Sequence, residues 1–77
     1  MEKDLASEKF LKKLGLHLRS IRLKKGWTLE QTEEHGWPSW RHLQKIESGK
    51  NITVTTLWKL SRVYKTSLSD VFTALEL

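Results

Sequence analysis

Residues 36–50, GWPSWRHLQKIESGK, place several polar and charged side chains on one short predicted helix. Leu43 and Ile46 stand three residues apart and predict the buried side of that helix. The side chains that lie away from this pair are those of Trp40, Arg41, Gln44 and Lys45. A helix that only packs against a core does not need guanidinium, amide and ammonium groups on its outer face. We therefore expect this face to bind a partner.

Positive charge is unevenly distributed along the 77 residues, whose formal net charge is +5. Residues 10–27 carry six Lys or Arg side chains and no acidic one. Residues 28–37 carry three Glu side chains, and residues 38–50 carry a net charge of +2. This alternation predicts one surface that faces a polyanion. Charge that serves only solubility is the alternative interpretation.

Composition argues against metal, disulfide and membrane roles. The absence of Cys excludes a disulfide framework and a thiolate zinc site. His17, His35 and His42 match no metal-binding spacing, so we interpret them as solvated side chains. No apolar segment approaches the roughly 20 residues of a membrane span, and the first nine residues lack the apolar stretch of a signal peptide. We expect a cytoplasmic protein with no metal and no cofactor.

An enzyme is the least favoured class of function. The chain has no thiol nucleophile, no triad-like arrangement of Ser and His, and no glycine-rich phosphate loop. A helical bundle of this size leaves little room for a catalytic cleft. We also expect no small-molecule ligand domain.

Apolar spacing predicts an amphipathic first helix over residues 10–25. Its stripe consists of Phe10, Leu11, Leu14, Leu18 and Ile21. Gly15 lies inside this helix, where glycine costs about 1 kcal/mol relative to Ala, so we expect another backbone to approach it closely. Residues 1–9 are either an N-terminal arm or an extra helical turn that starts at Asp4, and residues 10–77 form a single domain.

Capping residues mark four further helices, so the expected fold class is all-α with five helices. TLEQ at residues 28–31 is a capping box that starts a short second helix, which ends before Gly36. The remaining caps are Ser39, Thr53 and Ser67, and the third helix runs to about Ser48. The expected inward stripe of the fourth helix consists of Val54, Leu57, Leu60 and Val63. Leu68, Val71 and Phe72 anchor the fifth.

Three segments resemble the helix-turn-helix domains of the lambda repressor and Cro type, also called the xenobiotic-response-element family. They are LGLHLRSIRLKKGWTLEQ at 14–31, Ser39 with the KIESGK that begins at Lys45, and NIT at 51–53 followed by TLWKLSRVYKTSLSDVF. Together they cover about residues 11–72. The resemblance implies a compact five-helix domain whose second and third helices form the helix-turn-helix, with the third helix in the DNA major groove.

The second helix departs from the family pattern. Leu29 stands where the family often has Gln, and Thr32, Glu33 and Gly36 replace the usual Leu, Ala and Leu. Trp37 occupies the turn position that Gly usually fills. Gly36 takes that position only if one residue is inserted at Pro38. Both registers remain open.

The resemblance implies roles for the third helix. Base contacts would come from Trp40, Arg41, Gln44 and Lys45. Arg41 suits guanine O6 and N7, Gln44 suits adenine, and Lys45 suits guanine or a phosphate. Trp40 either contacts a thymine methyl or sugar edge, or folds back against the second helix. Trp37 is expected in the core, because the second helix is short of apolar volume.

The resemblance also implies a supporting set of contacts. Phosphate contacts would come from Ser39, Lys50, Asn51 and Thr53. Arg22 and Glu47 would form an ion pair that fixes the angle of the third helix. Lys12, Lys24 and Lys25 are interpreted as a solvated face rather than as base readers.

The favoured function is sequence-specific binding of double-stranded DNA by a repressor-like transcriptional regulator that acts as a homodimer. The expected dimer interface consists of Trp58, Leu68, Phe72, Leu75 and Leu77. The alternative is a protein-interaction adaptor or an antitoxin on the same fold. In that case the acidic second helix and the tryptophans would contact a protein partner.

Overall fold

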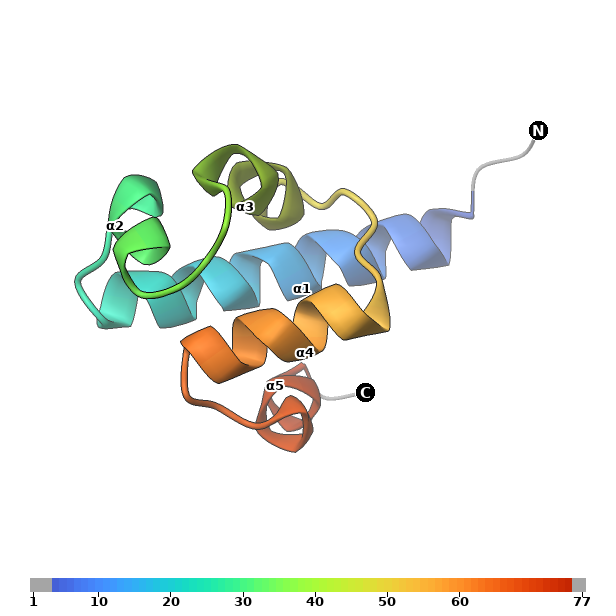
Figure 1. Cartoon of the computed structure of the whole chain (residues 1–77). Coiled ribbons are helices and arrows are strands. Elements are labelled where there is room, and N and C mark those ends of the chain that lie inside the picture. The colour runs from blue at the N-terminus through green and yellow to red at the C-terminus, as the bar shows by residue number, and fades with distance from the viewer. Residues whose placement is uncertain (1–3, 76–77) are drawn as a thin grey trace.

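The computed structural model describes residues 4–75 of the chain and contains five α-helices in that range. They are α1 (Leu5–Lys24), α2 (Leu29–Glu34), α3 (Trp40–Glu47), α4 (Val54–Val63) and α5 (Leu68–Ala74). No strand occurs among the described residues, which confirms the predicted all-α class. In the view of Figure 1, the short helices α2 and α3 lie on one side of the long α1, and α4 and α5 lie on the other. None of the helices within residues 4–75 has both the length and the apolar character that a bilayer crossing requires.

Residues 5–9 form the first part of α1 and are not a separate arm. Asp4 is the N-cap, and its Oδ1 accepts hydrogen bonds from the backbone N–H groups of Ala6 at 3.1 Å and Ser7 at 3.2 Å. A carboxylate at this position also interacts favourably with the helix dipole. Residues 5–9 therefore belong to α1, which was one of the two alternatives for this segment.

The core draws on every helix except α2, whose buried residue is Thr32. Its buried apolar side chains are Leu14, Leu18, Trp37, Leu43, Ile46, Leu57, Leu60, Tyr64, Val71 and Leu75. The predicted stripe of α4 is wrong at Val54, which is 74 % exposed because it is the first residue of the helix and lies beyond the core. Val63 is only half-buried, and Tyr64, one residue later, fills the core position instead.

Gly15 lies where α1 passes very close to the end of α3. A Cβ atom placed on Gly15 would lie 2.6 Å from the carbonyl oxygen of Ile46 and 2.7 Å from that of Glu47. Both distances are shorter than a van der Waals contact, so only glycine allows this approach. The expectation that another backbone passes close to Gly15 is confirmed.

The end of α2 resolves the register that the sequence left open. Gly36 adopts a left-handed conformation with φ of 110°, which a residue with a side chain rarely takes. The N–H of Gly36 donates to the carbonyl of Glu33, and the N–H of Trp37 donates to that of Thr32. This pair of hydrogen bonds is a Schellman termination. Gly36 therefore makes the turn, while Trp37 follows it and its side chain enters the core.

Candidate nucleic-acid interface

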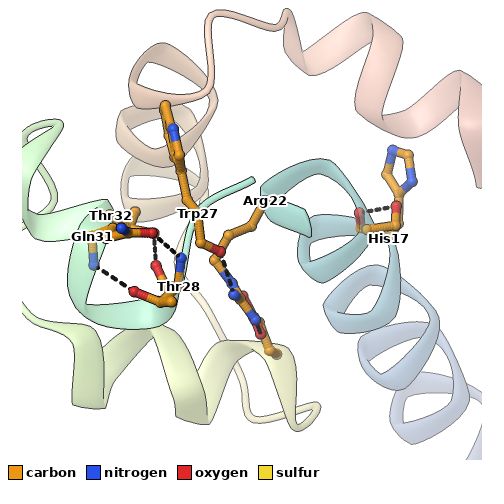
Figure 2. Close-up of polar contacts among 8 residues, drawn as sticks. His17, Arg22, Trp27, Thr28, Gln31 and Thr32 are labelled. Carbon is orange, nitrogen blue, oxygen red and sulfur yellow. Dashed lines mark hydrogen bonds and ion pairs between the residues drawn. The ribbon is translucent and has the colours of Figure 1, made fainter. Parts of the chain in front are cut away.

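Side-chain caps fix the starts of both α2 and α3. The Thr28 hydroxyl accepts from the N–H of Gln31 at 3.1 Å, and the Gln31 side chain accepts from the N–H of Thr28 at 2.8 Å, which confirms the predicted capping box (Figure 2). The Ser39 hydroxyl accepts from the N–H of His42 at 3.3 Å and caps α3. The starts of both helices thus follow from local sequence signals.

One contact across the turn has no local sequence signal. The Glu33 carboxylate accepts a hydrogen bond from the backbone N–H of Trp40 at 2.6 Å. Trp40 is the first residue of α3, where backbone N–H groups lack helical partners and the helix dipole favours a negative charge. Glu33 therefore ties α2 to the start of α3. It lies seven residues from Trp40, so only the three-dimensional path of the turn reveals the contact.

The inner side of α3 is fixed by burial. Leu43 and Ile46 are buried in the core, as their spacing predicts. Trp37 packs beside the first turn of α3, with its ring centroid 5.9 Å from that of His42. The start and the middle of the helix are thus both held against apolar side chains.

Arg22 and Glu47 form a bidentate ion pair that joins α1 to the last turn of α3. Arg22 Nε donates to Glu47 Oε2 at 2.7 Å, and Arg22 Nη2 donates to Oε1 at 2.9 Å. Each side chain is 8 % exposed. Arg22 Nη1 also donates to the carbonyl of Trp27 at 2.8 Å, as Figure 2 shows. The hydrogen bonds to Glu47 raise the pKa of Arg22, so the guanidinium stays protonated.

The outer side of α3 carries the candidate base-contact residues. Arg41, Gln44 and Lys45 are all exposed and share this side, and no carboxylate of α3 lies among them. Trp40 is half-buried at the start of the helix, and the Arg41 guanidinium lies 5.3 Å from the centroid of its ring. The four residues named from the resemblance thus lie along one helix, with three exposed and Trp40 at the edge.

The candidate phosphate-contact residues lie at the two ends of α3. Ser39 precedes the helix and is half-buried, while Lys50, Asn51 and Thr53 are exposed in the loop that follows it. The Thr53 hydroxyl accepts from the N–H of Thr56 at 3.1 Å and caps α4. Asn51 Oδ1 accepts from the N–H of Ile52 at 2.9 Å, which leaves the amide NH₂ of Asn51 to donate elsewhere.

The residues expected at a dimer interface do not form one exposed face. Trp58 is 46 % exposed, and the Arg62 guanidinium lies 5.0 Å from its ring centroid. Leu68 and Phe72 are half-buried and pack against the core. Leu75 is the C-cap of α5 and is 1 % exposed, so its assignment to a surface is wrong: its side chain completes the monomer core. Leu77 lies outside the described residues.

Comparisons with known proteins place this arrangement in a family. A helix-turn-helix family model matches residues 18–71, from the second half of α1 into α5. Neither the curated proteins nor the solved structures gave a significant match. The family match spans well over half of the chain and includes α2, the turn and α3. The chain therefore belongs to the Cro/C1-type helix-turn-helix family of DNA-binding transcription regulators.

Proposed function

We propose that this protein binds a specific sequence of double-stranded DNA by inserting α3 into the major groove. The observation that carries the proposal is the outer side of α3, where Arg41, Gln44 and Lys45 are exposed together, while the one carboxylate of α3, that of Glu47, is paired with Arg22. The major groove is about 12 Å wide and admits one α-helix. The buried inner side and the Arg22–Glu47 pair support the helix from behind.

Each exposed side chain of α3 has a distinct chemical match in the groove. The forked guanidinium of Arg41 suits the O6 and N7 acceptors of guanine, and the Gln44 amide suits N6 and N7 of adenine. Each such pair is worth about 1–3 kcal/mol of discrimination against the wrong base. The Lys45 ammonium suits guanine or a phosphate. Trp40 completes the proposed set at the start of the helix, where it contacts a thymine methyl or a sugar edge.

We propose phosphate contacts at both ends of α3. Ser39 lies before the helix, and Lys50, Asn51 and Thr53 lie in the loop after it. Such contacts fix the register of a protein on the duplex and carry little sequence information. They would therefore position the outer side of α3 against the base edges.

We further propose that the protein acts as a homodimer and represses transcription by occupying a palindromic site. Two half-sites in such operators lie about 34–36 Å apart, or one helical turn. Trp58 is the most exposed aromatic side chain among those named for the interface, and Leu68 and Phe72 are the apolar candidates on α5. Sedimentation should give a dimer at tens of micromolar, and Trp58→Ala should shift it toward monomer. A wild-type monomer at that concentration contradicts the dimer.

Selection of binding sites from a random duplex library, followed by sequencing, tests the function directly. We expect an enriched palindromic motif. Binding to that motif should be tighter than to a shuffled duplex, and log Kd should change steeply with log salt concentration, since phosphate contacts release counterions. An adaptor or antitoxin that uses acidic α2 and the tryptophans for a protein partner should show neither the motif nor the salt dependence.

A further inference from the structure

We propose that α1 supplies phosphate contacts of its own through Lys12 and Arg19, which we call the α1 basic edge. The inference rests on the proposed DNA binding by α3 and extends the DNA-contacting surface to a helix outside the helix-turn-helix. Both side chains are exposed. They are seven residues apart, two helical turns, so they lie on the same side of α1 about 10 Å from each other.

Arg19 lies next to the outer side of α3. A hollow of about 290 Å³ is lined by Arg19 and Arg22 of α1, Leu29 of α2, and Gln44, Glu47 and Ser48 at the end of α3. Arg22 and Glu47 neutralise each other there, and theirs is the one salt bridge found within residues 4–75. The guanidinium of Arg19 is therefore the uncompensated charge of this hollow, beside a proposed base-contact residue, Gln44.

Lys12 also lies beside the place where α1 contacts the end of α3. A second hollow, of about 240 Å³, is lined by Lys12, Leu16, Glu47 and Ser48. The stem of Lys12 also packs against the turn after α3: a Cβ atom placed on Gly49 would lie 2.9 Å from Lys12 Cγ. This contact holds the stem beside α3, while the side chain as a whole remains exposed.

The position of the α1 basic edge determines what it can contact. A helix in the major groove lies between two sugar–phosphate ridges, so groups beside the helix face phosphates rather than base edges. On one flank of α3, Gln44 borders α1; on the other, His42 borders α4 across the groove that contains Thr56 and Lys59. Lys12 and Arg19 lie on the α1 flank and would meet the phosphates of that ridge. This role differs from base reading and uses part of the uninterrupted positive charge of residues 10–27.

Salt-dependent binding of the full chain to two duplexes tests this inference. The duplexes are the library-selected site and a shuffled sequence, and the variants are Arg19→Ala, Lys12→Ala and the charge-retaining Arg19→Lys. The control is Lys13→Ala, which removes the same charge from an exposed position of α1 that lines neither hollow. Circular dichroism confirms that each variant remains folded.

We expect Arg19→Ala and Lys12→Ala each to weaken binding to both duplexes by the same factor, because phosphate contacts are not sequence-specific. Each should reduce the slope of log Kd against log salt by about 0.9. Arg19→Lys should keep most of the slope, and Lys13→Ala should leave it at the wild-type value.

Three results overturn the inference, and each is distinguishable from the others. If the wild-type protein selects a site but Arg19→Ala and Lys12→Ala behave like Lys13→Ala, only the α1 basic edge is wrong. If the wild-type protein binds neither duplex, the proposed function fails and the inference fails with it. Loss of affinity for the selected site alone would instead make Arg19 a base reader and would also contradict phosphate contact.

Discussion

The inner and outer sides of α3 differ in how strongly the fold constrains their side chains. On the inner side, Leu43 and Ile46 are buried, and Glu47 makes two hydrogen bonds to Arg22. On the outer side, Arg41, Gln44 and Lys45 are exposed, and the fold does not require their identities. We therefore expect stability to depend on the inner side of this eight-residue helix and the proposed DNA recognition to depend on its outer side. Substitutions on one side should leave the property of the other side unchanged.

Glu47→Ala should produce the largest loss of stability. It removes the partner of Arg22 and leaves a guanidinium buried without its carboxylate, which costs about 3–5 kcal/mol. Thermal denaturation followed by circular dichroism measures the effect. Arg41→Ala, on the outer side of the same helix, is the matched control and should change the melting temperature little. Equal shifts for the two variants would contradict the comparison.

Gly15→Ala should have the next largest effect on stability. The added methyl group would meet the carbonyl oxygens of Ile46 and Glu47, so α3 must move away from α1 at a cost of about 1–3 kcal/mol. Chemical denaturation measures this cost. Leu16→Ala, at the neighbouring exposed position, should change the free energy of unfolding by only about 0.5 kcal/mol or less. A stable Gly15→Ala variant would show that the close approach does not exist.

Arg41→Ala should affect recognition and leave stability unchanged. We expect the difference in binding free energy between the selected site and a site with one altered guanine to shrink by about 1–3 kcal/mol. Titration of the two duplexes at a single salt concentration gives this difference. An Arg41→Ala variant that keeps the full difference would remove Arg41 from the base-reading set.

Glu33→Ala should have the smallest effect. It removes the hydrogen bond to the Trp40 N–H and the negative charge at the start of α3, which together contribute about 1 kcal/mol. Glu34→Ala, an exposed neighbour without this contact, is the control for charge alone. If both variants unfold at the same denaturant concentration, Glu33 does not tie the two helices together.

The parts of the fold that depend on local chemistry could be predicted from the sequence. Each helix cap involves a side chain and a backbone N–H only three residues later in the sequence. The predicted caps at Thr28, Ser39, Thr53 and Ser67 each start a helix in the structure. Together with the apolar stripe of residues 10–25, they predicted the number of helices and the fold class. The apolar stripe of α4 was predicted less well, because periodicity alone does not show that Val54 lies beyond the core and that Tyr64 lies within it.

The parts that depend on how the chain turns in space could not be predicted. The choice between Gly36 and Trp37 depends on the length of the turn, which no local pattern fixes. The Glu33–Trp40 contact depends on the same turn. Leu75 was assigned to the expected dimer interface, and only the packing of α5 shows that its side chain completes the core.

The central claim is that α3 reads the major groove through Arg41. Its most direct test is binding of the selected duplex after one chemical group of a guanine base has been removed from either groove. Replacing a contacted guanine with 7-deazaguanine removes an acceptor from the major groove, whereas inosine removes only the minor-groove amino group. We predict that 7-deazaguanine weakens wild-type binding, that inosine does not, and that Arg41→Ala no longer responds to 7-deazaguanine. Sensitivity to inosine alone, or an equal 7-deazaguanine effect in the Arg41→Ala variant, would show that α3 does not read the major groove through Arg41.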